Sequence, residues 1–343
     1  MKLKFKLLTL FIACSCFLSY AGDYTKKIYR AYPKNDVSAL NINNKYGAIT
    51  INDAGGDSVT IDVTVVVESI NEDKAKQLLN QIDVAFSKSG KTVIAETNIN
   101  SDFTINQNFR INYKVNIPAN RDLNITNKYG NLTINNLEAR GKFQIAYGNI
   151  AAETLNAPGS ESIFLDLAYG KADIQGVNRL NTIIKYSKLF LGEANRLQLE
   201  SKYSTIDIDE VGELHTESKY DGFSIDEAGS ITADSKYTHY NIDELKKKFV
   251  LVSEYGNITI DEVSADFETI DITSSYGGIK LGLDEKAYTL SAECSYCNID
   301  YPEELFSGNR EKDNQNMKIE GKVSNGTANV HIISRYGGIK LTE

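Results

Sequence analysis

One short unit recurs along this chain and limits what it can fold into. A tyrosine, then a small or polar residue, then alternating β-forming residues occurs twelve times. From Tyr169 to Tyr255 the tyrosine positions advance by 17, 17, 17, 17 and 18, and the later steps are 21, 20 and 40. We interpret the step of 40 as two turns of the repeat, one of them degenerate. The tyrosines are Tyr46, Tyr129, Tyr147, Tyr169, Tyr186, Tyr203, Tyr220, Tyr237, Tyr255, Tyr276, Tyr296 and Tyr336.

Each unit alternates apolar and polar residues, as strands with one buried face do. One coil cannot bury its apolar face alone, whereas a stack of coils can. The pattern predicts an all-β fold, a parallel β-solenoid of about 17–20 residues per coil with like positions about 4.8 Å apart. Parallel crossovers favour a right-handed coil. In the coil from Leu214 to Ser230 the expected inward set is Leu214, Thr216, Ser218, Tyr220, Phe223, Ile225 and Ala228, and the outward set is His215, Glu217, Lys219, Ser224 and Asp226.

The residue after the tyrosine is small in most copies. It is glycine in seven of them, and Ser187, Ser204, Asp221, Thr238 or Cys297 in the others. A turn that required a positive φ at this position would reject threonine, so we expect a tight corner that needs a small side chain. The tyrosine rings should form a stacked column there, primarily as a structural feature. A carbohydrate-binding strip is the alternative, and it requires exposed rings.

One stretch interrupts the repeat, because the interval between Tyr46 and Tyr129 is several times longer than one coil. Residues 69–72 match a capping box, and apolar residues at helical spacing follow. We predict a leader at 1–21, first solenoid coils at 22–64, an α/β excursion or cap at 65–110 with one helix near 70–83, and the main solenoid at 111–343. A cap is expected because the open end of a parallel stack pairs readily with other chains.

The first 21 positions of the chain indicate export. Three lysines precede an apolar run from Leu7 to Leu18, and Ser19-Tyr20-Ala21 is a small-x-small cleavage site. We expect the protein in the periplasm, on the cell surface or secreted, with a lipoprotein anchored at Cys14 as the alternative. No later stretch reaches the roughly 18 apolar residues of a membrane helix. A net charge of −9 and a pI near 5.1 argue against nucleic acid or an anionic membrane as partner.

The repeated YG-x-I-x-I units lead to a known family, together with the segment from Phe109 to Gly130, in which a strand and a proline turn run into a repeat. They resemble the bacterial "putative adhesin" family, domains of unknown function common in Bacteroidetes. The resemblance spans nearly the whole chain after the leader. It implies a β-solenoid at the envelope or surface, and it carries over no catalytic residue. The chain departs from the pattern in its central SKY-type repeats, which lack the glycine, and in Cys294 and Cys297.

Stacking of the coils predicts a row of like charges. Such charges repel, and a cation such as Ca²⁺ between coils would relieve the repulsion. An ordinary solvated acidic edge is the main alternative, since the sequence has no calcium-loop motif. We expect no other cofactor. The weak calcium candidates are Asp209, Asp226, Asp243 and Asp261, each followed by a glutamate.

A second outer face carries charges of both signs in two parallel rows. We expect these rows to interleave as cross-strand pairs, each contributing about 0.2–1 kcal/mol on an exposed surface. A periodic face of this kind suits an extended ligand. The candidate binding face consists of Lys202, Lys219 and Lys236 beside Glu200, Glu217 and Asp234.

Cys294 and Cys297 lie within one repeat as Cys-Ser-Tyr-Cys. Two cysteines with no histidine nearby in sequence cannot form a four-ligand zinc site. A thioredoxin-like redox motif would stand at a helix start, which this stretch lacks. We therefore expect a corner disulfide formed in an oxidising compartment.

Motifs for catalysis are missing from the sequence: it has three histidines and no nucleophile elbow, phosphate loop or zinc-binding histidine pair. The sequence favours an exported, non-enzymatic, adhesin-like surface or envelope protein that binds or scaffolds. Its partner would be an extracellular or envelope polymer, a glycan or a matrix protein. The alternative is a carbohydrate-active β-helix enzyme of the polysaccharide lyase or hydrolase type, which needs long loops around a cleft.

Overall fold

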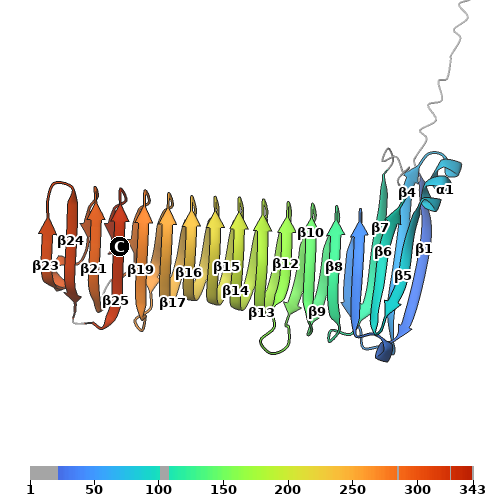
Figure 1. The fold of residues 1–343 in the computed structure, drawn as a ribbon, viewed down its shortest axis with the longest axis horizontal. Helices are drawn as coiled ribbons and strands as arrows, with labels where there is room; N and C mark the ends of the chain where they lie inside the picture. Colours follow the sequence, from blue (N-terminus) through green and yellow to red (C-terminus); the bar gives the residue numbers. More distant parts are fainter. Residues whose placement is uncertain (1–21, 101–107, 284–285, 325, 342–343) are drawn as a thin grey trace, which may run out of the picture.

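The structure is a computed structural model that describes residues 22–100, 108–283, 286–324 and 326–341, so the expected leader and Cys14 lie outside the described residues. Its strands stack side by side into one long β-solenoid (Figure 1). The predicted parallel β-solenoid is therefore confirmed. Each central coil is one long strand paired in parallel with the next coil. These strands are β13 (Lys171–Lys185), β14 (Lys188–Lys202), β15 (Thr205–Lys219), β16 (Gly222–Lys236) and β17 (His239–Glu254).

Coils on either side of the centre are built from shorter strands that keep the same register. Leu123 of one coil pairs with Gly141 of the next, and Ile163 with Leu180. Apolar residues point inward at alternate positions, so every coil adds a layer to one continuous core. These strands are β8 (Asp122–Lys128), β9 (Leu132–Leu137), β10 (Gly141–Ala146), β11 (Ile150–Leu155), β12 (Ile163–Ala168), β18 (Ile258–Val263), β19 (Thr269–Ser275) and β20 (Ile279–Leu281).

The repeated tyrosine itself adopts the left-handed backbone conformation. All twelve copies have φ between 51° and 61°. This residue interrupts the inward–outward alternation of side chains. Lys219 and Tyr220, for example, are consecutive, and both side chains point outward. The expectation that Tyr220 lies on the inward face is thus wrong, and the positive φ sits on the tyrosine rather than on the next residue.

The residue after the tyrosine packs against the coil below. A Cβ built on Gly148 would lie 2.1 Å from the carbonyl oxygen of Gly130, so these corners admit only glycine. Elsewhere a side-chain oxygen fills the corner and bonds to the neighbouring coil. The backbone N–H of Gly170 donates to Ser187 Oγ at 3.0 Å, and that of Ser187 donates to Ser204 Oγ at 3.3 Å. The corner therefore has two compatible packings, which explains the mixed residue types.

The N-terminal end is covered by antiparallel strands and one helix. Strand β4 (Ser58–Ser69) pairs antiparallel with β1 (Gly22–Pro33) and β7 (Phe109–Ile117). Helix α1 (Glu72–Asn80) contacts β4, and η1 (Lys34–Asp36) follows β1. Strand β5 (Ile82–Ser89) pairs antiparallel with β6 (Thr92–Ile99). One coil, β2 (Ala39–Lys45) with β3 (Ile49–Asp53), lies between this cap and β8–β9.

The predicted boundaries of this region need correction. Strands β1 and β4 belong to the antiparallel cap, so 22–64 is not a run of solenoid coils, and the cap reaches Ile117 through β7. The helix begins at Glu72 because Asn71, rather than Ser69, is its N-cap: Asn71 Oδ1 accepts from the backbone N–H of Lys74 at 3.0 Å. The Ser69 side chain instead accepts from the backbone N–H of Asn71.

The C-terminal coils do not follow chain order. Strand β25 (Ala328–Arg335) lies between β19 and β21 (Tyr288–Ser295), parallel to both. Strand β26 (Ile339–Lys340) likewise lies between β20 and β22 (Ile299–Asp300). The antiparallel strands β24 (Asn316–Val323) and β23 (Phe306–Lys312), the latter after η2 (Glu303–Leu305), cover the far side of β21.

This order corrects the interpretation of the long step from Tyr296 to Tyr336. The step spans an antiparallel hairpin and a return of the chain, not two successive coils. Two edges of the growing stack are thereby closed at once: β24 covers one side of β21 and β25 covers the other.

Candidate functional site

The twelve tyrosines form a column along one corner, which we call the tyrosine ladder. Neighbouring ring centroids are 4.7–5.1 Å apart and their planes lie within 18° of parallel. The inserted strand β25 places Tyr336 between Tyr276 and Tyr296. Eleven of the rings are 40–50% exposed. The ladder is therefore continuous across the whole stack despite the change in chain order.

Stacking decides which part of each ring faces solvent. Rings 4.7–5.1 Å apart cover one another's faces, and Phe109 covers the outer side of Tyr46 at 5.1 Å. The exposed parts are ring edges and hydroxyl groups. A sugar that stacks on aromatic faces finds none along the ladder, so the carbohydrate strip considered from the sequence has little geometric support.

A row of lysines runs beside the ladder. Lys185, Lys202, Lys219 and Lys236 pair in register across β13–β16, and we call them the lysine row. Lys202 Nζ lies 5.3 Å from the ring centroid of Tyr203, and Lys219 Nζ lies 5.6 Å from that of Tyr220. Lys236 Nζ binds Glu254 Oε1 at 3.1 Å. The side chains thus lean toward the ladder or along the row.

Glu200, Glu217 and Asp234, the acidic row, are exposed two positions before the lysines on the same strands. The expected interleaving of the two rows is absent from the described residues: no ion pair joins a member of one row to a member of the other. In the same part of the chain, none of these three carboxylates has a hydrogen-bond partner. The acidic row is consequently free to meet a ligand.

The acidic row lines a shallow groove of about 610 Å³ on the outside of β12–β17. Gln198, His215 and Thr232 form a parallel polar row in the same groove. Apolar residues line it as well, with Phe164 and Ile183 from the coils on one side and Val250 and Val252 from β17 on the other. The lysine row does not line it, so the candidate face divides into a groove and a separate Tyr–Lys edge. The alternation in the sequence predicts which side chains point outward, but not the concavity that makes the groove.

A lysine lies among the carboxylates next to the calcium candidates. Lys246 Nζ lies 2.7 Å from Glu244 Oε1 and 3.3 Å from Glu227 Oε2, so an ammonium group sits between successive glutamates. Hydrogen bonds from Lys246 and Ser264 lower the pKa of Glu244. Desolvation, followed by the charges of Asp226 and Asp207, raises the pKa of Asp209. Across the described ranges no three His, Cys, Asp or Glu side chains gather as metal ligands.

Cys294 and Cys297 are joined by a disulfide at the corner that carries Tyr296, with their Cα atoms 5.4 Å apart. Cys294 is buried and occupies an inward position, and the residue at the same position in the neighbouring coil is Ser334. The bond fixes the outermost rung of the ladder, where β24 replaces the next coil.

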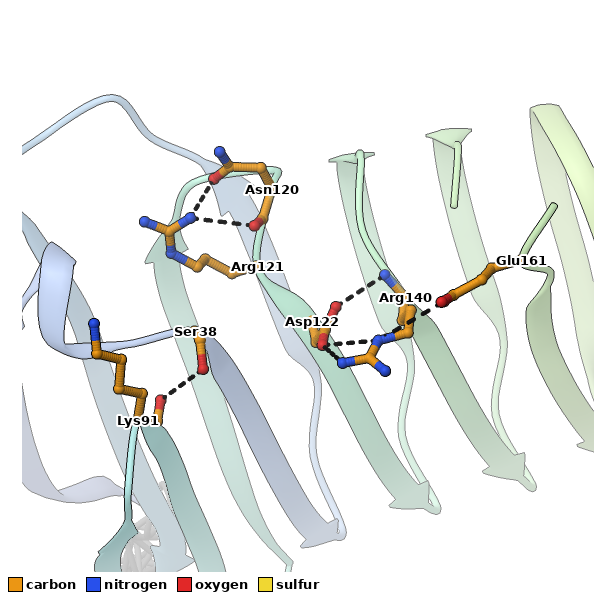
Figure 2. Close-up of polar contacts among 7 residues, drawn as sticks. All are labelled: Ser38, Lys91, Asn120, Arg121, Asp122, Arg140 and Glu161. Atoms are coloured by element: carbon orange, nitrogen blue, oxygen red, sulfur yellow. Dashed lines mark hydrogen bonds and ion pairs between the residues drawn. The ribbon is translucent and has the colours of Figure 1, made fainter. Parts of the chain in front are cut away.

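Polar contacts also bind successive coils at the start of β8, β10 and β12. Figure 2 shows Arg140 between Asp122 and Glu161, with its Nε 3.8 Å from Glu161 Oε2 and its Nη2 bound to Asp122. The side-chain hydrogen bond to Asp122 raises the pKa of Arg140. The network joins three coils and serves the stack rather than a reaction.

The three histidines are not gathered into one site. His215 lines the groove, and His239 Nδ1 accepts from the backbone N–H of Asn257 at 3.2 Å. His331 Nδ1 lies 2.9 Å from Asp271 Oδ1 on the adjacent coil. Within the described ranges, no helix is long and apolar enough to cross a membrane.

Comparisons with known proteins give a family and distant likenesses. A family model described as Toastrack DUF4097 matches residues 37–342. No functionally curated protein matches the chain. A solved "putative cell adhesion protein" from Clostridium sporogenes is 9% identical, with a TM-score of 0.20, over 93% of this chain and 99% of its own.

Two other solved structures come from Parabacteroides. A "putative adhesin" from Parabacteroides merdae is 13% identical, with a TM-score of 0.35, over 75% of this chain and 96% of its own. A "putative lipid binding protein" from Parabacteroides distasonis is 13% identical, with a TM-score of 0.38, over 74% and 96%. At these scores the three structures carry no argument about what this chain binds.

Proposed function

The chain belongs to the Toastrack DUF4097 family, and we propose that it is a non-enzymatic, adhesin-like binding protein of the envelope or cell surface. Its β-solenoid would hold an extended extracellular or envelope polymer, a glycan or a matrix protein, along the candidate face. Export rests on the leader pattern in the sequence. The partner class rests on the shape and charge of the face.

The observation that carries this proposal is the acidic row in the groove. Glu200, Glu217 and Asp234 recur once per coil, are exposed, and have no hydrogen-bond or ion-pair partner among the described residues. A polymer along the solenoid axis would meet a carboxylate on each of three successive coils, about 4.8 Å apart, with Ile183 and Val252 at the same position in the coils on either side. Each contact is weak on an open surface, and repetition along one ligand raises the total affinity.

A carbohydrate-active enzyme is the second candidate, favoured by neighbouring carboxylates in one groove. Against it, the central coils join through very short turns, such as Tyr186 and Ser187 between β13 and β14. Turns of this length cannot wall a substrate cleft. The groove is open along the stack, which suits holding a chain better than enclosing a reacting bond.

A glycan and matrix-protein array with the chain from Gly22 onward tests the proposal. We expect binding that weakens with salt and is lost in E200Q/E217Q/D234N or in K202S/K219S/K236S. The matched control K27S/K247S/K312S changes exposed lysines away from the face and should bind like the wild type. Binding that ignores both salt and the two face variants would contradict the proposal. Cleavage of a bound glycan would favour the enzyme.

A further inference from the structure

We propose that the central tyrosine ladder and the lysine row form a binding edge for long, flat, anionic aromatic molecules that lie along the solenoid axis. The edge comprises Tyr186, Tyr203, Tyr220 and Tyr237 with the four lysines that precede them. It is separate from the groove, and its ligand is a small molecule rather than a polymer. The lysine row belongs to both proposals, so the tyrosine variants and the acidic-row variant are the ones that separate this edge from the function proposed above.

Each tyrosine of the ladder presents only one part of its ring to solvent. The faces are covered by neighbouring rings, and the tyrosines of this stretch are 40–49% exposed, so the exposed parts of the rings are their edges. The edge is the positive part of the aromatic quadrupole, so it attracts the negative face of another π-system in an edge-to-face contact. A flat molecule laid across the ladder would receive such a contact from each ring it spans.

The spacing of the rings favours a long ligand. The three ring-to-ring distances in this stretch are 5.0, 4.8 and 4.7 Å, and the planes lie within 13° of parallel. A rigid extended aromatic molecule keeps the same contact along its length, whereas a compact one reaches only one or two rings. The backbone holds the rings in place before binding, which lowers the ordering cost of association.

The charge beside the ladder is positive. Each lysine of the row immediately precedes a ladder tyrosine, while the acidic row lies two positions further back on the strand. A ligand over the rings therefore meets ammonium groups first. Among the described residues, Lys185, Lys202 and Lys219 have no ion pair, and Nζ of Lys202 and of Lys219 already lies 5.3 and 5.6 Å from the ring centroid of the tyrosine that follows it. Sulfonate or carboxylate groups on the ligand would complement this row.

Two dyes of opposite charge probe the edge. Congo red is long, flat and anionic, and thioflavin T is flat and cationic. With the chain from Gly22 onward, titration calorimetry should show Congo red binding at least tenfold tighter than thioflavin T. In Y186N/Y203N/Y220N the affinity for Congo red should fall at least tenfold. Asparagine suits this substitution because it tolerates the left-handed backbone that these tyrosines adopt.

Matched variants separate this edge from other surfaces. Y29N removes a 57%-exposed tyrosine outside the ladder and should change nothing. Y186F/Y203F/Y220F keeps the rings and should retain most of the affinity, and K185Q/K202Q/K219Q should abolish the preference for the anionic dye. E200Q/E217Q/D234N should leave dye binding intact even if it abolishes polymer binding.

Absence of Congo red binding would overturn the proposal, as would binding unchanged in both the asparagine and the lysine variants. If the asparagine variant loses its circular dichroism spectrum, the lysine and phenylalanine variants decide. If the lysine variant still prefers the anionic dye, the proposed binding edge is rejected. If the variant loses that preference, the binding edge is supported.

Discussion

A tyrosine in the left-handed backbone region is strained, because its Cβ crowds the carbonyl group; the strain is about 1–2 kcal/mol per residue. In this chain the conformation recurs at every rung of the ladder. Each ring also stacks on its neighbours at 4.7–5.1 Å, and such aromatic pairs contribute about 0.5–1.5 kcal/mol beyond burial. The two effects are similar in size, so the stack offsets the strain that the corner imposes.

The glycine corner gives a prediction at the residue scale. Gly148→Ala places a Cβ 2.1 Å from the carbonyl oxygen of Gly130, so the two coils must separate locally, at a cost of at least about 2 kcal/mol. Gly222→Ala is the matched control, because nothing lies within 4 Å of its Cβ, and its effect should stay within about 0.5 kcal/mol. Urea denaturation of the two variants tests this. Equal effects would contradict the tight corner.

Asp221 gives a second prediction at this scale. Its carboxylate is buried in a corner where other coils have serine, and desolvation raises its pKa although Ser201, Ser204 and Lys219 donate to it. A raised folded-state pKa means that the stability due to this group is present at acid pH and is lost as the pH rises through that pKa. The difference in Tm, Asp221→Ser minus wild type, should therefore be more positive at pH 7 than at pH 3.5. A larger relative gain at pH 3.5 would contradict the assignment.

At the scale of elements, the inserted strand β25 is the least expected part of the fold. Its inward residues Val330 and Ile332 are fully buried, and it pairs with β19 on one side and β21 on the other. Removing it would leave two unpaired parallel edges inside the stack. Such edges pair readily with other chains, so we expect the strand to limit association as well as to complete the core.

Two neighbouring isoleucines of β25 test this role. Ile332→Asp buries a charge in the core and should release β25 and β26, making residues 324–341 sensitive to protease and producing oligomers in size-exclusion chromatography. Ile333→Asp is the control, because Ile333 is 40% exposed and should behave like the wild type. A protease-resistant, monodisperse Ile332→Asp protein would show that the insertion does not need this contact.

The whole molecule is a rod whose two ends are built differently from its middle. Antiparallel strands cover both ends, and the outermost strands carry charges or proline, such as Lys27, Arg30 and Pro33 in β1 and Arg310 and Lys312 in β23. These features discourage another strand from adding to either end. Stability in such a stack is close to a sum of terms between neighbouring coils.

Two buried tyrosines report on whether this rod unfolds as one unit. Burial raises the pKa of Tyr113 in β7 and of Tyr240 in β17 to about 12. An unfolded tyrosine ionises near 10, so their stability contribution is present below pH 10 and lost between about 10 and 12, each by up to about 1.4 kcal/mol per pH unit.

We therefore expect the Tm to fall between about pH 10 and pH 12, and less steeply in Tyr240→Phe and in Tyr113→Phe. A single transition flattened by either variant indicates one cooperative unit. Two transitions, each sensitive to one variant, would show that the cap and the coils unfold separately. A Tm independent of pH in this range would contradict the pKa values.

The sequence predicts the fold best in the central coils, where the same residue pattern repeats. The regular spacing of the tyrosines predicts the parallel stack, and the alternation predicts which side chains of β15 and β16 point outward. The predicted boundaries at 64/65 and 110/111, and the interpretation of the step from Tyr296 to Tyr336 as two coils, are wrong because short apolar strands look alike in parallel and antiparallel pairing. The groove beside Glu217 is lined by residues of six strands, from Phe164 in β12 to Val252 in β17, and no local pattern in the sequence shows that they enclose a hollow together.

Chain order at the C-terminal end has a consequence for biosynthesis. Strand β21 is made before β25, yet β25 must lie between β19 and β21. A chain synthesised from its N-terminus therefore cannot complete these coils in sequence order. The space between β19 and β21 must stay open until β25 and β26 have been made. The time needed to make the last strands thus sets a lower limit on when the rod is finished, however fast the central coils form.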